Sequence, residues 1–319
     1  EGRPAVRGSR TGDGRGFARA AVRALAIALL VIAPLALFEL VLHLVDYPPA
    51  RDRQFSLLVR KLDAALDESG RLLKESPVYF WENIPGNAAE HVESHGLRND
   101  EVAIRKPPGT YRILMLGDSI TYGMFVPWDE AFPALVDRAL NEAAGGAPGG
   151  RRVEVLNAGV IGYSSFQGLM IFRDRYAAFA PDLVVVSYYQ NDEDTDFSIA
   201  DADLFARNRY LYGPAGRYRG VRLHTLMMDA WYRVSDRFAP HLERAIPKKT
   251  RVPPVEYEKN LGEIARLART GGAGVVFVRQ PYNKAFPAEK WNPRMEQYTE
   301  SLARAAAANR VPVVVVDEL

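Results

Sequence analysis

A serine stands where a buried strand is expected to break into a loop and a helix. The tetrad Gly117-Asp118-Ser119-Ile120 follows an apolar, β-rich run over residues 111–116. Glycine permits a tight turn there, and the free N–H groups at the start of the next helix favour a developing negative charge. Ser119 is therefore a candidate nucleophile. An ordinary turn followed by a helix cap would give the same tetrad.

Two further motifs fall at the same point in the alternation of strands and helices. Asn157-Ala158-Gly159-Val160-Ile161-Gly162 follows an apolar run that begins at Val153, and Gln190-Asn191-Asp192 follows the run over residues 183–189. The carboxyl ends of parallel strands meet at one edge of a sheet, where α/β proteins place their chemistry. All three motifs are therefore expected at that edge.

With these motifs the chain resembles the SGNH/GDSL hydrolase family, whose pattern is Gly-Asp-Ser, a glycine, Asn-Asp and then Asp-x-x-His. The resemblance covers residues 110–319. It implies that Ser119 forms an acyl-enzyme intermediate. It also implies an oxyanion hole made by the backbone N–H groups of Ser119 and Gly162 and the side-chain amide of Asn191. Such donors stabilise the charge that develops on oxygen when an ester carbonyl is attacked.

The chain departs from the family pattern at two places. Tyr189 holds the glycine position of the family's Gly-x-Asn-Asp block. The Asp-x-x-His block, which supplies the family's general base, is absent, because the chain stops at Leu319 directly after an apolar run and Asp317. We therefore expect the base beyond Leu319. Because the first residue is Glu1 rather than methionine, the chain is expected to be clipped at both ends.

Other titratable residues are expected to have supporting or surface roles. Asp118 and Asp192 are interpreted as hydrogen-bonding supports of their loops. A substitute base is the less favoured alternative for four histidines, which are interpreted as surface or insertion residues: His91, His95, His224 and His241. The acidic run over residues 192–196 lacks the glycine and the distal glutamate of an EF-hand. We therefore expect no metal and no cofactor.

Composition narrows the protein class. A hydrophobic content of 48% and a charged content of 25% are ordinary for a folded protein. The net charge of +2 argues against nucleic acid as a partner. The absence of cysteine excludes disulfides, thiolate zinc sites and a thiol nucleophile.

The N-terminus predicts a membrane anchor. A basic segment, residues 1–19, precedes an apolar stretch over residues 20–45 that is long enough to cross a bilayer of about 30 Å. By the positive-inside bias the N-terminus is cytoplasmic, and the rest of the chain after the helix is periplasmic or extracellular. Glu39 and His43 are expected near the outer interface or against a partner helix. The alternatives are a buried soluble helix or a signal peptide, although no convincing Ala-x-Ala site follows.

The remaining pattern predicts an α/β fold with a parallel five-stranded sheet of flavodoxin-like order, after one N-terminal transmembrane helix. The family resemblance implies the three-layer SGNH-hydrolase sandwich. Apolar runs predict strands and periodic segments predict helices. The predicted strands are 111–116, 153–157, 183–189, 274–279 and 311–316, and the helices are 130–143, 165–178, 255–269 and 293–309.

Two segments lie outside this alternation. Residues 46–109 are predicted to form a juxtamembrane amphipathic helix, over residues 54–74, and a lead-in to the hydrolase domain at residues 110–319. Residues 193–254 form an insertion rich in aromatic residues and arginine, which is interpreted either as a cap that selects the substrate or as a structural insertion.

The leading hypothesis is a membrane-anchored extracytoplasmic serine esterase. Its partners would be the membrane, through residues 20–45, and an acyl-ester substrate such as an O-acetylated envelope polysaccharide or a lipid. One alternative is an O-acyltransferase that uses the same serine on envelope glycans. The other is a non-catalytic glycan-binding protein on the same scaffold.

Overall fold

The computed structural model describes most of the chain in two units. The described residues are 14–45, 72–76, 78–143, 149–194, 200–212, 221–235, 249–280 and 294–316. One unit comprises residues 1–50 and 218–234, and the other comprises residues 51–217 and 235–319.

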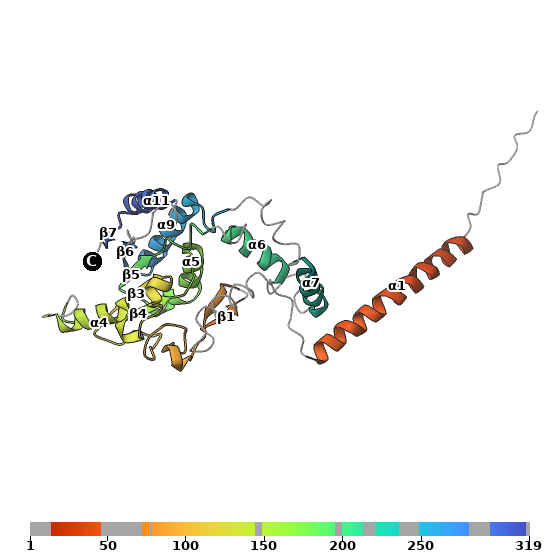
Figure 1. Ribbon diagram of the computed structural model, residues 1–319, viewed down its shortest axis with the longest axis horizontal. Coiled ribbons are helices and arrows are strands. Elements are labelled where there is room, and N and C mark those ends of the chain that lie inside the picture. Colours follow the sequence, from red (N-terminus) through yellow and green to blue (C-terminus); the bar gives the residue numbers. More distant parts are fainter. Residues whose placement is uncertain are drawn as a thin grey trace, which may run out of the picture. The chain divides into compact units, whose positions relative to one another are not determined.

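The larger unit contains a five-stranded parallel sheet in the order β4-β3-β5-β6-β7 (Figure 1). Its strands are β3 (Thr110–Gly117), β4 (Arg152–Gly159), β5 (Leu183–Ser187), β6 (Gly274–Arg279) and β7 (Val313–Val315). In chain order this is 2-1-3-4-5, the flavodoxin-like order, so the predicted fold is confirmed. The carboxyl ends of the first three strands are level, because Gly117 pairs with both Gly159 and Ser187.

Some predicted boundaries were wrong. β5 ends at Ser187 rather than at residue 189, because Tyr188 and Tyr189 leave the ladder. The helix predicted over residues 165–178 ends at Asp174, because Arg175 leaves the helical region and a short 3-10 turn, η3 (Tyr176–Phe179), follows.

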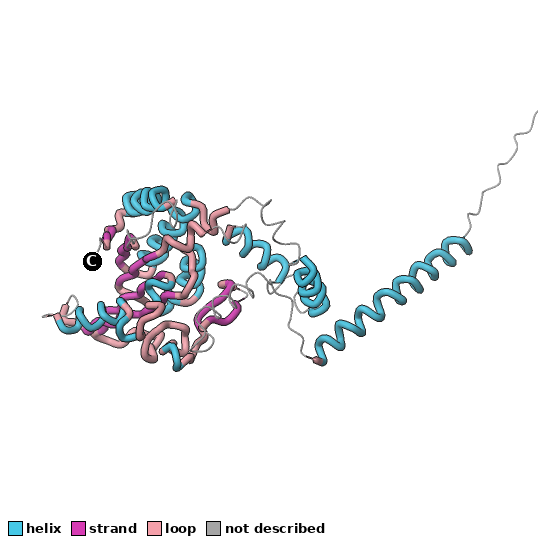
Figure 2. Tube along the Cα trace, viewed as in Figure 1, coloured by secondary structure: helices cyan, strands magenta, loops and turns pink. Residues whose placement is uncertain are grey.

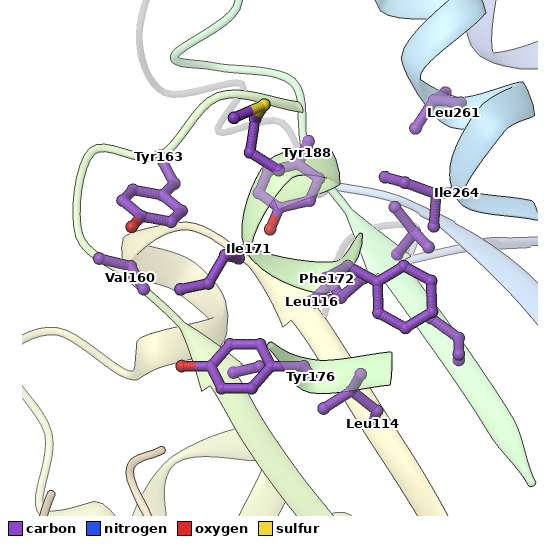
Figure 3. Close-up of a cluster of buried hydrophobic side chains, with 14 of the residues drawn as sticks. Leu114, Leu116, Val160, Tyr163, Ile171, Phe172, Tyr176, Tyr188, Leu261 and Ile264 are labelled. Carbon is purple, nitrogen blue, oxygen red and sulfur yellow. The ribbon is translucent and has the colours of Figure 1, made fainter. Parts of the chain in front are cut away.

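Helices pack on both faces of the sheet (Figure 2). The face that carries Ile113 and Met115 packs against α4 (Phe132–Glu142). The face that carries Leu114 and Leu116 belongs to the main core, together with side chains of α5 (Ser165–Asp174), α9 (Pro254–Thr270) and α11 (Met295–Asn309). This alternation along β3 follows from the two-residue period of a strand. Figure 3 shows part of the main core, where Ile171 and Phe172 of α5 lie beside residues of β3 and α9: Leu114, Leu116, Leu261 and Ile264.

A hairpin precedes the sheet in the chain and joins the same core. Its antiparallel strands are β1 (Leu73–Ser76) and β2 (Phe80–Asn83), followed by the 3-10 turn η1 (Ala88–Glu90). Trp81 of β2 is fully buried in the main core. The juxtamembrane helix predicted over residues 54–74 lies outside the described residues except at its end. There Leu73 and Lys74 belong to β1 instead, since they pair with β2.

The smaller unit contains two helices, α1 (Gly14–Leu44) and α7 (Arg222–Ser235). Residues Phe17–Leu44 reach a mean hydropathy of 2.7 in their most apolar part. Within the described ranges, this is the one helix that is long and apolar enough to cross a membrane. A signal sequence near an N-terminus meets the same criterion. Glu39 of α1 accepts hydrogen bonds from the backbone N–H groups of Arg222 and Leu223 at the start of α7, both at 2.6 Å.

Candidate active site

The Ser119 loop, residues 117–119, joins β3 to the single-turn helix α3 (Ser119–Tyr122). A Cβ atom on Gly117 would lie 2.9 Å from the carbonyl oxygen of Ser187, so only glycine fits at this close approach. Asp118 caps α3, because its Oδ1 accepts from the Ile120 N–H at 2.9 Å. The sequence therefore places Ser119 at the first position of a helix, half-buried at the end of the central strand.

Asp118 is buried and connects three strand ends. Besides capping α3, it accepts from Gln280 Nε2 at 2.9 Å and from Asn191 Nδ2 at 3.4 Å, both at its Oδ2. Gln280 also donates to the Ser187 carbonyl at 3.1 Å. Burial raises the pKa of Asp118 to about 6. The structure thus places this carboxyl group within the framework of the site, and its role as a loop support stays a prediction.

The Gly162 loop, residues 159–163, leaves β4 and is fixed by hydrogen bonds to its carbonyl groups. Val160 first donates its N–H to the Gly117 carbonyl at 3.1 Å, which joins this loop to the Ser119 loop. Gly162 has a φ of 77°, in the left-handed region that favours glycine. Four side chains from three other parts of the chain then donate to four carbonyls of the loop: Asn83 to Gly159 at 3.0 Å, Trp81 to Ile161 at 2.8 Å, Arg251 to Gly162 at 2.8 Å and Asn191 to Tyr163 at 3.0 Å.

Asn191 bridges the loops. It follows β5, and its Nδ2 donates both to the Tyr163 carbonyl and to Asp118. The structure therefore brings together Ser119, Gly162 and Asn191, the three predicted oxyanion-hole residues, at the carboxyl ends of adjacent strands. Since both contacts use Nδ2, donation to a substrate oxygen would require exchange of one of them, and the contact to Asp118 is the longer.

The two predicted backbone donors are open. Among the described residues, no acceptor takes the N–H of Ser119 or of Gly162. The residue that follows each of them is paired, since the Tyr163 N–H donates to the Val160 carbonyl at 3.1 Å and the Ile120 N–H donates to Asp118 at 2.9 Å. Unpaired N–H groups beside a serine at a helix start are suited to hold a negative oxygen.

Asp192 is hydrogen-bonded to the start of α5, and its role as a loop support stays a prediction. It is fully buried and accepts from the N–H of Ser165 at 3.0 Å and from the Ser165 hydroxyl at 2.5 Å. Burial raises its pKa to about 8. Tyr189, at the family's glycine position, packs its ring against Tyr298 with ring centroids 5.7 Å apart.

His91 and His95 lie beside carboxylates. His91 Nε2 lies 2.8 Å from Asp100 and its ring stacks on Trp128, while His95 Nδ1 lies 2.7 Å from Glu93. His241 and Asp317 lie outside the described residues, and the general base stays a prediction.

Glu93, His95 and Glu101 also lie close enough to share a cation. However, Glu93 already accepts from the N–H groups of His95 and Leu97, at 2.8 and 2.9 Å. These hydrogen bonds account for the position of the Glu93 carboxylate, so the cluster gives no reason to assign a metal.

Four residues that contact the loops of the site were not predicted from the sequence, namely Trp81, Asn83, Arg251 and Gln280. Trp81 and Asn83 lie in the lead-in, and Arg251 lies near the end of the insertion. No spacing or motif marks these residues, because each reaches the site from a distant part of the chain.

The chain matches a known protein family. The model of the GDSL-like Lipase/Acylhydrolase family matches residues 115–319. No curated protein matches the chain.

Solved structures are similar at low identity. AlinE4, an SGNH-hydrolase family esterase, is 16% identical with a TM-score of 0.38, and the alignment covers 66% of this chain and 77% of that one. The lipase/acylhydrolase from Enterococcus faecalis is 19% identical with a TM-score of 0.39, covering 64% and 75%. LAE5, from the metagenome of Lake Arreo, Spain, is 20% identical with a TM-score of 0.40, covering 64% and 76%. Because the family model spans well over half of the chain, the protein belongs to the GDSL-like lipase/acylhydrolase family and is an SGNH-type ester hydrolase.

Proposed function

We propose that the protein is a membrane-anchored extracytoplasmic serine esterase that cleaves acyl or acetyl esters of envelope carbohydrate or lipid. Ser119 would be the nucleophile, and the N–H groups of Ser119 and Gly162 with the amide of Asn191 would form the oxyanion hole. The main support for this proposal is that the N–H groups of Ser119 and Gly162 have no acceptor among the described residues. Asn191 connects the two loops that carry them, through hydrogen bonds to Asp118 and Tyr163.

The chemistry follows from this arrangement. Ser119 Oγ attacks the acyl carbon, the hydroxyl proton passes to a base, and the carbonyl oxygen becomes negative beside the three donors. The bond to the alcohol then breaks, and the alcohol leaves with a proton. Water hydrolyses the acyl-serine by the same steps and releases the acid. The base is the histidine that the family pattern supplies after the last strand.

An apolar rim beside Ser119 supports an acyl ester as the substrate. Phe125 is 81% exposed and has a φ of 71°, which is unusual for a large side chain. Ile120 and Val126 are also exposed. The segment is tied to the nucleophile, because the Met124 N–H donates to the Ser119 carbonyl at 3.0 Å.

The N-terminal helix supports anchoring. The apolar stretch Phe17–Leu44 has 28 residues, enough to cross a hydrocarbon layer of about 30 Å. The arginines before it favour a cytoplasmic N-terminus. Glu39 lies near the far end of the stretch. Its carboxylate accepts hydrogen bonds at the N-terminus of α7, where the helix dipole stabilises a negative charge. This contact reduces the cost of an acidic residue near the membrane.

The test is hydrolysis of p-nitrophenyl acetate by the full chain, expressed from its natural reading frame, beside Ser119→Ala. We expect the variant to fall to the background rate, because it lacks the nucleophile. Ser94→Ala, a variant of an exposed serine away from the Ser119 loop, serves as the matched control and should keep the wild-type rate. Equal rates for Ser119→Ala and wild type would refute the assignment. Transfer that exceeds hydrolysis when a glycan is added would instead identify an O-acyltransferase.

A further inference from the structure

A tryptophan outside the family motifs contacts the peptide next to the proposed oxyanion donor. Trp81 is fully buried in β2, and its indole Nε1 donates to the Ile161 carbonyl at 2.8 Å. The two residues are 80 positions apart in the chain. Trp81 also precedes residues 115–319, the part that the family model matches.

The geometry of a peptide links this hydrogen bond to the Gly162 N–H. The Ile161 carbonyl and the Gly162 N–H belong to one planar peptide unit, which is trans because the described chain has no cis bond. In a trans peptide the two groups point in opposite directions. A donor that fixes the carbonyl on one side therefore fixes the direction of the N–H on the other side.

The next peptide is held as well. Arg251 Nη1 donates to the Gly162 carbonyl at 2.8 Å, and its guanidinium lies 5.4 Å from the centre of the Trp81 ring. The Tyr163 hydroxyl donates back to the Trp81 carbonyl at 2.7 Å. Both peptides that flank Gly162 are thus held from outside the loop, and Trp81 is itself held by that loop.

This restraint matters because Gly162 has no side chain and a φ of 77°. Glycine populates several backbone regions with little cost, so the direction of its N–H is not set locally. An oxyanion donor contributes most to the rate when it is already aimed at the charge that develops.

We propose that Trp81 is a positioning residue that aims the Gly162 N–H at the substrate oxyanion, an inference that rests on the proposed esterase function. The indole acts through the Ile161–Gly162 peptide and does not touch the substrate. The lead-in hairpin would then be part of the catalytic apparatus, although it lies outside the family motifs.

The test replaces Trp81 in the full chain with phenylalanine, which keeps an aromatic ring and removes the N–H. We expect kcat for p-nitrophenyl acetate to fall by about 10- to 100-fold, less than for loss of a whole donor, with KM nearly unchanged. The rate at which a p-nitrophenyl phosphonate modifies Ser119 should fall in parallel, because its phosphoryl oxygen also requires the donors.

A second replacement guards against poor folding of Trp81→Phe. β-(3-Benzothienyl)alanine at position 81 replaces the indole N–H with sulfur at nearly the same volume, and it should give the same loss of kcat. Phe172→Leu is the matched control, since Phe172 is buried in the same core and makes no hydrogen bond to the Gly162 loop. It should lower the melting temperature while kcat stays within about twofold of the wild type.

The outcomes separate the two proposals. An unchanged kcat in the benzothienyl protein would overturn the role of Trp81, as would a loss in Trp81→Phe that Phe172→Leu reproduces. If Ser119→Ala keeps the wild-type rate in the same assay, the esterase site itself is misassigned and the positioning role fails with it.

Discussion

At the residue scale, the buried carboxyl groups show how the site is built. Asp118 and Asp192 follow β3 and β5, and each accepts hydrogen bonds from the start of a helix. Ser119 and Asn191, which directly neighbour them in the chain, are half-buried. Each motif thus has one residue facing the framework and one residue at the edge of the site.

Asp192 predicts a pH dependence of stability. Its pKa is raised from 3.8 to about 8 in the folded state, so between these values the folded chain holds a proton that the unfolded chain has lost. Asp192 should therefore contribute fully to the free energy of unfolding below about pH 4. This contribution should fall as the pH rises toward 8. Asp192→Asn keeps an acceptor for Ser165 without the charge and should reduce this fall, which is about 4 kcal/mol between pH 5 and 8 at about 1.4 kcal/mol per pH unit.

Urea unfolding at a series of pH values measures this effect. Asp203→Asn, a change at an exposed position of α6 (Asp201–Tyr212), is the control and should leave the pH profile as it is in the wild type. Parallel profiles for Asp192→Asn and wild type would show that the raised pKa of Asp192 does not govern stability.

At the element scale, the sequence predicted the sheet and the three motifs because both depend on local patterns. Apolar runs such as residues 274–279 mark buried parallel strands, and glycine with Asn or Asp marks the turns after them. The β1–β2 hairpin was missed, since two four-residue strands offer too little alternation to recognise. Contacts such as that between Trp81 and Ile161 depend on the tertiary fold and have no local signature.

The ends of the insertion are closed by an ion pair that was also not predicted. Arg251 pairs with Asp201, at the start of α6, at 3.0 Å, and both side chains are almost fully buried. Backbone hydrogen bonds from Asp201 to the Arg251 carbonyl and from Arg251 to the Asp194 carbonyl join the same ends. Ser164 also donates to Asp201 at 2.6 Å, so the insertion is fastened to the start of α5.

Removing one partner of this pair should destabilise the larger unit. Arg251→Met leaves the carboxylate of Asp201 buried without its cation, and we expect a loss of about 3–5 kcal/mol in the free energy of unfolding. The double variant Arg251→Met/Asp201→Asn removes both charges and should recover part of the loss. Urea denaturation of the single and double variants measures the coupling. A loss below about 1 kcal/mol in Arg251→Met would contradict the importance of this pair.

At the scale of the whole molecule, one apolar helix and one hydrolase unit are combined in a single chain. The location of the substrate therefore depends on what α1 does. An anchor keeps the helix attached to the enzyme, whereas a cleaved signal sequence would release the enzyme without it.

Anchoring predicts a simple fractionation result. The full chain should sediment with membranes and resist carbonate extraction, and its N-terminal peptide should remain detectable by mass spectrometry. A variant that lacks residues 14–45 should be soluble when it is produced in the cytoplasm, because the apolar stretch is gone. Recovery of a shortened, soluble form from cells that express the full chain would contradict anchoring and identify a signal sequence.

Covalent labelling of the nucleophile tests the assignment of Ser119 directly. The full chain, expressed from its natural reading frame, is treated with a p-nitrophenyl phosphonate, and the modified peptide is sequenced by mass spectrometry. We expect a single adduct on Ser119, formed in step with loss of esterase activity, and no adduct in Ser119→Ala. An adduct on another residue, or full activity in a protein modified at Ser119, would contradict it.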